Sequence, residues 1–215
     1  MITIKKARSF LRNNFLKKRL IFLVDDRLEG SDLCLQNDFE INVLGNSDKE
    51  ALMECLASLD DYSMKEKILE KMESPLVNFC YAMEAVTGKL AGFWLVAGPH
   101  EDVIWFDNYY VKPGDIMAMQ GFMSPEYRGR NVFPLIVFST FNYFSKTGKV
   151  NRILYVVEKN NNSSVNANRK AARVVGVNYL IKFFRRNIFS LIIDINGWQL
   201  FYVYKKHCSN GLNYF

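Results

Sequence analysis

The order of sequence patterns between residues 115 and 158 constrains the fold more than any other feature of this chain. Residues 115–123 have a strand pattern, and the run VFPLIVFSTFNYFSK, which follows after a short turn, is apolar almost all round. Such a run predicts a buried helix over residues 132–146, with Pro134 in the first turn, where proline is tolerated. RILYVVE, residues 152–158, predicts a strand buried on both faces. A helix between two such strands predicts a crossover connection and one parallel strand pair.

The segments on either side of this crossover complete an α+β fold with a mixed central sheet and flanking helices. Ahead of the crossover, strand patterns separated by turn residues predict two helices and then an antiparallel meander. Behind it, a capped pattern predicts a helix over residues 163–173 that closes at Gly176, and Asn196-Gly197 suits the turn of a C-terminal β-hairpin. The other expected strands are 20–24, 39–44, 76–84, 89–97, 103–111, 191–195 and 198–206, and the expected early helices are about 48–59 and 63–72.

The first 20 residues carry only basic charges, and their apolar residues recur at helical spacing. This pattern predicts a basic amphipathic helix, which either packs on its own domain or attaches to an anionic membrane surface or an acidic partner. The predicted organisation is an extension with this helix and a strand over residues 1–36, a main domain over 37–206 and a tail over 207–215. The formal net charge of +6 likewise favours an anionic partner.

Cysteine and histidine usage predicts neither a metal centre nor a disulfide framework. The four cysteines are far apart in the sequence, a C-x-x-C pair is absent, and there are only two histidines. No apolar run reaches the length of a membrane span, and the first residues lack the apolar core of a secretory signal. These features predict a cytoplasmic protein, with peripheral attachment at the inner face of the membrane as the alternative if the basic helix docks there.

The turn Arg128-Gly129-Arg130-Asn131 predicts an anion site because it delivers the chain to the start of the buried helix. The first N–H groups of a helix lack intrahelical partners, and the helix dipole favours negative charge there. Arg128 and Arg130 would add charge-assisted hydrogen bonds to a phosphate. Gly129 allows close backbone approach, and Asn131 tolerates a positive φ. The alternative is an ordinary turn with solvated arginines.

This stretch resembles the acetyl-coenzyme A motif Q/R-x-x-G-x-G/A of the GNAT (GCN5-related N-acetyltransferase) superfamily, which a strand and a Pro-Glu-Tyr-Arg-Gly phrase usually precede. The segment PEYRGR, residues 125–130, matches that phrase well. Asn131 replaces the first motif glycine, and Phe133 replaces the final small residue. The predicted order of elements over residues 39–206 is also that of a GNAT domain, and residues 160–176 loosely resemble a second phrase of the family. The resemblance therefore implies a GNAT-like fold whose parallel strand pair is splayed at a cofactor slot.

The resemblance also implies which residues would bind acetyl-CoA, or another acyl-CoA, as co-substrate. The main chain of Phe122 and Met123 would pair with the pantetheine arm, and a bulge at this point would splay the parallel strands. Asn168 would contact the pantetheine or the sulfur. The pyrophosphate would bind the main-chain N–H groups of the turn and first helical residues, which are Arg128, Gly129, Arg130, Asn131, Val132 and Phe133.

Three residues are candidates for the catalytic chemistry, which needs a base for the amine and an acid for the departing thiolate. Glu158, at the end of the buried strand, is the first candidate base, and Asp107, within WFDNYY, is the second. In the family a tyrosine often acts as the acid that protonates the departing thiolate. That tyrosine is absent here, because Ala172 stands at the matching position. Tyr179 could replace it, or the thiolate could leave through water. Strand-end or solvated charges are the structural alternative for both carboxylates.

The sequence leaves three hypotheses for function. The first is an N-acyltransferase that transfers acetyl from acetyl-CoA to a primary amine of a small molecule, such as an amino sugar. The second is an N-acyltransferase whose donor is an acidic acyl carrier protein. The third is a GNAT-fold binding or sensor module that has lost catalysis, which the substitutions at Asn131 and Phe133 favour. A homodimer is compatible with each, whereas a nucleic-acid partner is not expected, since no recognition motif is present.

Overall fold

A computed structural model describes residues 16–25, 38–59, 61–99, 104–106, 109–146, 148, 150–183, 186–194 and 197–202. The elements, in chain order, are β1 (Leu16–Val24), β2 (Phe39–Leu44), α2 (Lys49–Ala57), α3 (Tyr62–Met72), β3 (Val77–Glu84), β4 (Leu90–Ala97), β5 (Ile104–Phe106), β6 (Tyr109–Val111), β7 (Asp115–Met123), the 3-10 helix η2 (Pro125–Tyr127), α4 (Val132–Ser145), β8 (Arg152–Glu158), α5 (Asn162–Asn168), β9 (Arg173–Phe183), β10 (Arg186–Asp194) and β11 (Gly197–Tyr202).

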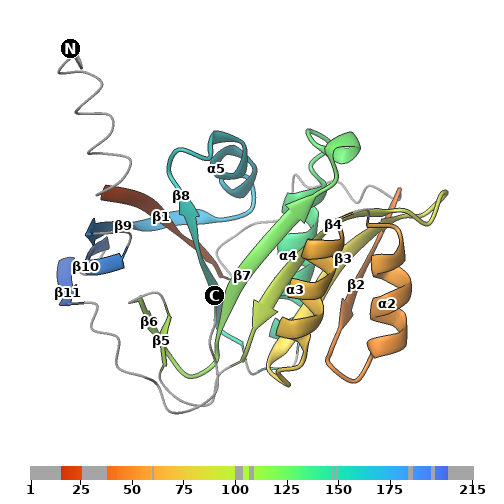
Figure 1. The fold of residues 1–215 in the computed structure, drawn as a ribbon, viewed down its shortest axis with the longest axis horizontal. Coiled ribbons are helices and arrows are strands. Elements are labelled where there is room, and N and C mark those ends of the chain that lie inside the picture. The colour runs from red at the N-terminus through yellow and green to blue at the C-terminus, as the bar shows by residue number, and fades with distance from the viewer. Residues whose placement is uncertain are drawn as a thin grey trace.

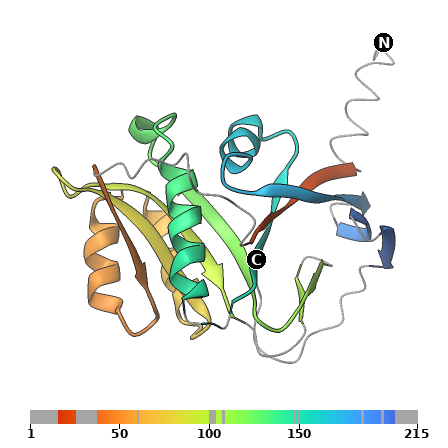
Figure 2. The same ribbon diagram turned by 180° about the vertical axis from the view of Figure 1, so that it is seen from behind.

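The described strands form one nine-stranded mixed sheet and a separate two-stranded sheet (Figure 1). The large sheet has the order β11-β10-β9-β1-β8-β7-β4-β3-β2. Its neighbours run antiparallel except for β7 and β8, which are parallel. Helices α2 and α3 lie on one face, and α4 lies on the other (Figures 1 and 2). The predicted α+β fold, with its meander, one parallel pair, flanking helices and C-terminal hairpin, is confirmed.

The two faces of the sheet carry separate hydrophobic cores. On the α4 face, Phe22, Trp94 and Tyr155 pack against apolar residues of the helix, such as Ile136. On the opposite face, the apolar side chains of α2 and α3 pack on β3 and β4. Since β4 is buried along its whole length, it forms the centre of both cores. The parts of β7 and β8 nearest this centre are therefore held rigidly, which matters for the site that they form.

Strand β1 lies in the middle of the sheet, between β8 and β9, although the sequence predicted it to belong to an N-terminal extension. Its residues Leu20–Val24 are buried. The predicted boundary at residue 36 thus falls between two strands of the same sheet. The basic helix was predicted over the first 20 residues, and this is wrong for residues 16–20, which form the start of β1 because they pair with β8 and β9. Residues 1–15 lie outside the described residues, as do residues 203–215 with the predicted tail.

Two predicted elements are wrong in detail, for different reasons. The helix predicted over residues 163–173 ends at Asn168, because the β-branched stretch from Arg173 pairs with β1 and starts β9. Gly176 consequently lies within a strand instead of closing a helix. The single strand predicted over residues 103–111 is divided into β5 and β6, which pair with each other. The two residues between them, Asp107 and Asn108, are of types that favour turns.

The elements around the crossover agree closely with the prediction. Strands β2, β7 and β8 have the predicted bounds, and α4 ends one residue before the predicted end. Gly148, just beyond α4, has φ 68°, a conformation that suits glycine after a helix. Strand β8 is buried only at Ile153–Tyr155, while its last three residues are half-buried. That partial exposure reflects a cleft beside it.

Candidate functional site

Strands β7 and β8 pair only at their N-terminal ends and then diverge. The parallel register covers Asp115–Met117 opposite Arg152–Leu154, whereas both strands continue further (Figure 1). The Arg152 guanidinium donates two hydrogen bonds of 2.7 Å to the Asp115 carboxylate, so a charged clamp holds the closed end. A register shift against β4 leaves Met119 as the extra residue of a β-bulge, which bends β7 away from β8. The predicted splaying of the parallel pair is thereby observed.

The divergence opens a cleft of about 660 Å³, within the size range of ligand sites. One wall is β7 from Ala118 to Met123, and the other is β8 from Tyr155 to Glu158 together with α5. The start of α4 lies at the cleft's end. Most of the predicted site residues line this one cleft: Phe122, Met123, Arg128, Gly129, Asn131, Val132, Phe133, Glu158 and Asn168.

The turn before α4 has the backbone conformation that the sequence predicted. Gly129 has φ 83° and Asn131 has φ 58°, both in the left-handed region. The main-chain N–H groups of Arg128 and Arg130 donate within the turn, to the carbonyls of Pro125 and Tyr127 at 3.3 and 3.4 Å. These turn bonds do not use the main-chain N–H groups of Gly129, of Asn131 or of the first α4 residues. The cleft extends to the same residues. N–H groups in this position, at the start of a helix, are of the kind that hold anions in proteins.

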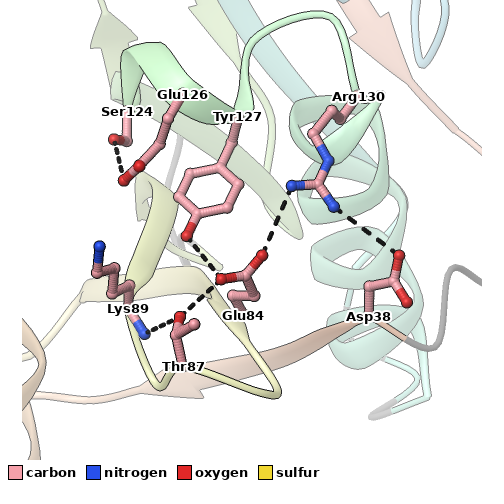
Figure 3. Close-up of polar contacts among 8 residues, drawn as sticks. All are labelled: Asp38, Glu84, Thr87, Lys89, Ser124, Glu126, Tyr127 and Arg130. Atoms are coloured by element: carbon pink, nitrogen blue, oxygen red, sulfur yellow. Dashed lines mark hydrogen bonds and ion pairs between the residues drawn. The ribbon is translucent and has the colours of Figure 1, made fainter.

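The two arginines of the turn have different surroundings. Arg128 lines the cleft and donates to the Met123 carbonyl at 3.4 Å. The Arg130 side chain instead points toward Glu84 of β3 and Asp38, at 3.5 and 3.9 Å (Figure 3). Its guanidinium also stacks over the rings of Phe39 and Tyr127, at 5.1 and 5.5 Å. Arg130, which the sequence predicted to be a phosphate ligand, therefore anchors the turn to the β2–β3 edge and does not line the cleft.

Glu84 is the centre of this anchor (Figure 3). Its carboxylate accepts hydrogen bonds from the hydroxyls of Thr87 and Tyr127, at 2.6 and 3.0 Å. The pKa of Glu84 is held below its usual value, mainly by the hydrogen bond from Thr87 and next by the hydrogen bond from Tyr127 and the charge of Arg130. Burial, followed by the bond to Glu84, raises the Tyr127 pKa. A carboxylate, a phenol and a guanidinium thus fix the position of the loop that precedes α4.

The two motif departures have defined contacts. Asn131 accepts a hydrogen bond of 2.6 Å at its Oδ1 from Lys170, which ties the turn after α5 to the start of α4. The Phe133 ring packs edge-on against Trp94, 6.0 Å between centroids. A Cβ atom on Gly121 of β7 would lie 2.8 Å from the Phe133 ring, so the glycine makes the space that this ring fills. Phe133 therefore lies across the cleft, against β7 and β4.

Two polar side chains in the cleft lack hydrogen-bond partners among the residues that the structure describes. They are Tyr155, at its hydroxyl, and Asn168, at Oδ1. Both residues are almost fully buried, with 4% and 3% of their surface exposed. Asn168 uses its amide N–H₂ to bond the Ser164 carbonyl at 2.7 Å, which leaves its acceptor oxygen for a ligand N–H or O–H. Unsatisfied buried polar atoms are unfavourable, so a ligand that pairs with them gains affinity.

Further polar groups lie on the other face of the splayed strands. Tyr155 and Val157 join the α4-side core, so alternation along β8 directs Glu158 to the opposite face. Arg19 of β1 is opposite Glu158 in the antiparallel register. Burial lowers the Arg19 pKa, and the Glu158 charge partly restores it. Glu158 thus lies at the cleft's edge beside a cation.

A second pair joins α3 to the open part of β7. Lys71 donates to the Gln120 side chain at 3.0 Å, and burial lowers the Lys71 pKa. Gln120 also lines the cleft. Four residues described here were not predicted to belong to the site from the sequence: Gln120, Lys71, Arg19 and Tyr155. A sequence signal existed only for Tyr155, which stands at the centre of the buried run RILYVVE.

Of the other two candidate catalytic residues, the structure describes only Tyr179. Tyr179 lies in β9, where the Lys18 ammonium is 4.9 Å from its ring centroid, and it is not among the cleft residues. Asp107 lies outside the described residues. Their catalytic roles remain predictions.

Metal and membrane features were also sought in the described part of the chain. No group of three or more metal-ligating side chains occurs there. None of the described helices combines the length and the apolar character needed to cross a bilayer.

Comparisons with known proteins bear on the fold. No protein-family model matches the sequence, and no curated protein does. An aminoglycoside acetyltransferase from an uncultured soil metagenomic sample, solved with trehalose, has a TM-score of 0.44 and 10% identity, covering 64% of this chain and 89% of its own. A GCN5-related N-acetyltransferase from Sphaerobacter thermophilus has a TM-score of 0.49 and 13% identity, and the match covers 81% of this chain and 54% of that protein. A GNAT-family acetyltransferase from Colwellia psychrerythraea has a TM-score of 0.47 and 12% identity, and the match covers 82% of this chain and 61% of that protein.

The structural neighbours are thus acetyltransferases that cover most of the chain, and two of the three are described as GCN5-related or GNAT-family proteins. At these identities the likeness concerns the fold alone.

Proposed function

We propose that the chain is an acyl-CoA-dependent N-acyltransferase that transfers acetyl from acetyl-CoA to a primary amine of a small molecule. The observation that supports this most is the splayed parallel pair, whose cleft ends at a left-handed turn and a helix N-terminus. A cradle of main-chain N–H groups suits a pyrophosphate. A narrow slot between two strands suits an extended chain that carries a thioester, and no metal is required.

The residues around the cleft fit this co-substrate in both charge and hydrogen bonding. The N–H groups of Gly129, Asn131 and Val132, with the Arg128 guanidinium, would hold the pyrophosphate. The main chain of Phe122 and Met123 would pair with the amides of the pantetheine arm, as an added strand does. The unpartnered Oδ1 of Asn168 would accept one amide N–H. The role of Arg130 is then to hold the turn, since its guanidinium pairs with Glu84.

The reaction needs a neutral amine placed against the thioester carbonyl. In the proposed mechanism the amine approaches from the α3 face, where Glu158 accepts a proton, directly or through a water. Arg19 lies opposite Glu158 in the register of β1 and β8 and places a positive charge beside this carboxylate. Gln120, tied to Lys71, would orient the acceptor at the same face. The acceptor's identity is not specified by these groups, and amino sugars are one class to include in a screen.

Calorimetric titration of acetyl-CoA and of free coenzyme A into the protein tests the proposal. We expect binding by the wild type and a roughly tenfold or greater loss of affinity in Arg128→Ala, because one charge-assisted hydrogen bond is removed. Lys146→Ala removes the same charge from the exposed opposite end of α4 and serves as the matched control. Absence of binding to either ligand by the wild type would refute the proposal.

The Phe133 ring favours a second candidate, a binding module without catalysis. This ring occupies part of the cleft beside Gly121 and Trp94. A protein of that kind would bind coenzyme A and yet transfer no acetyl group to any amine. A turnover assay over a panel of primary amines, run on protein already shown to bind acetyl-CoA, separates the two candidates.

A further inference from the structure

Tyr155 is a buried residue at the point where the two parallel strands part. Pairing between β7 and β8 ends at Met117 and Leu154, and Tyr155 is the next residue of β8. It lines the cleft, only 4% of its surface is exposed, and its hydroxyl has no hydrogen-bond partner among the described residues. A buried hydroxyl without a partner costs roughly 1–3 kcal/mol. A position of this kind needs an explanation beyond packing.

The ring of Tyr155 is fixed by its neighbours, so its hydroxyl is held in one place. It stacks on Phe22 with 5.3 Å between centroids and an interplanar angle of 7°. It also meets Trp94 edge-on, with centroids 5.2 Å apart at 88°. A phenylalanine would make both contacts equally well. The aromatic packing therefore explains the ring and leaves the oxygen unexplained.

The direction of the bound donor brings its reactive end toward this residue. If the pyrophosphate lies at the start of α4, the arm must run back along β7, from Met123 toward Ala118. Five residue steps of an extended strand span roughly 17 Å, comparable with an extended pantetheine arm. Ala118 and Tyr155 are the first residues of the two strands beyond the parallel pairing, and both line the cleft. The thioester would therefore end beside the Tyr155 hydroxyl.

We propose that Tyr155 is the general acid of the acetyl transfer, donating its phenolic proton to the departing sulfur. This inference rests on the proposed function. The amine nitrogen forms a bond to the thioester carbonyl carbon, and the C–S bond then breaks. The sulfur keeps that electron pair and takes the proton from Tyr155. The proton that the amine loses to Glu158 returns through solvent to the tyrosinate, so charge and protons balance over a turnover.

The phenol is protonated before the reaction begins. Burial raises the pKa of Tyr155, which keeps the proton on the oxygen at neutral pH and makes the phenol a weak acid until negative charge develops on the sulfur. A fixed donor that waits for negative charge to develop on sulfur stabilises the transition state more than the ground state. This assignment places the acid on β8, beneath the cleft, and not on the helix that follows, where Ala172 stands.

Tyr155→Phe tests the inference, because it removes only the oxygen. We expect thiol release from acetyl-CoA to fall by roughly 10²–10⁴-fold, measured with an active amine from the panel or with hydroxylamine. Calorimetric affinity for acetyl-CoA should stay within a few-fold, and thermal stability should be unchanged or higher, because a buried unsatisfied group is removed. Tyr143→Phe, which alters an exposed tyrosine on α4, is the matched control.

A second measurement separates an acid from a residue that only shapes the cleft. A fluorinated tyrosine introduced in place of Tyr155 has a more acidic phenol, so thiol release at a fixed neutral pH should be at least as fast as with tyrosine, whereas Tyr155→Phe stays slow. Wild-type turnover by Tyr155→Phe, or a fluorinated variant as slow as Tyr155→Phe, would overturn the inference while leaving the proposed function standing. Failure of the wild type to bind coenzyme A would overturn both.

Discussion

Gly121→Ala is the substitution whose effect follows most directly from the geometry of the cleft. The added Cβ would lie 2.8 and 3.1 Å from two atoms of the Phe133 ring and 3.4 Å from Trp94. The backbone of Gly121 has no positive φ, so steric overlap is the main cost. The ring has to move, which forfeits its edge-on contact with Trp94, roughly 0.5–1.5 kcal/mol, and overpacking brings the total to roughly 1–3 kcal/mol. Urea unfolding followed by tryptophan fluorescence measures this loss.

A double-mutant cycle with Phe133→Ala tests the reasoning. Once the ring is absent, an alanine at position 121 meets nothing closer than Trp94, and the lower entropy of the unfolded chain favours it by about 0.4–1 kcal/mol. We therefore expect a coupling energy of roughly 1–3 kcal/mol between Gly121 and Phe133. Additive effects, within about 0.5 kcal/mol, would show that Phe133 does not fill the space above Gly121.

Other predictions concern the clamp, the cysteines and the anchor of the turn. Asp115→Asn should destabilise the fold by about 3 kcal/mol in urea unfolding, because Arg152 loses an almost fully buried charged partner. Burial raises the pKa of the Cys55 and Cys80 thiols to about 12, so mass-spectrometric mapping should find both unmodified by a thiol reagent in native protein at about pH 8. The folded pKa of Glu84 is depressed, so its contribution is present above its unfolded pKa and is lost as pH falls through the folded value. The stability difference between wild type and Glu84→Gln should hence shrink from about pH 7 to about pH 3, and a difference independent of pH would contradict the assigned bonds.

The sequence predicted the crossover and its turn well because local patterns determine both. The long apolar run of α4 can be satisfied only in the interior, and the Gly129 and Asn131 residue types match the left-handed conformations that they adopt. Positions in the cleft followed from this: a residue just before or within the first turn of α4 must lie near the end of β7. Phe122, Asn131 and Phe133 all line the same cleft for this reason.

Apart from the division of the strand predicted over residues 103–111, the failures involve contacts between distant parts of the chain. Strand β1 reads as a short apolar strand, and no local pattern says that it inserts between β8 and β9. Without this pairing, Arg19 could not be connected with Glu158. Nor could the partner of Arg130 be foreseen, since Glu84 lies 46 residues earlier on β3. The end of α5 was missed because β9 recruits Arg173 onward through its pairing with β1, a tertiary demand that overrides the helical pattern.

The departures from the acetyl-CoA motif are more informative with their contacts than as isolated mismatches. Asn131 takes the left-handed conformation that a glycine would take, and its side chain adds a bond to Lys170 across the cleft's end. Phe133 is matched by Gly121, the residue whose lack of a side chain makes room for the ring. A sequence drifting without a ligand to bind would have no reason to keep the cleft open. Yet the turn before α4 has its left-handed conformation, and two buried polar groups that line the cleft, Tyr155 and Asn168, have no hydrogen-bond partner in the described part of the chain. Because such groups cost stability, their presence favours a site that binds a polar chain over a relic of one.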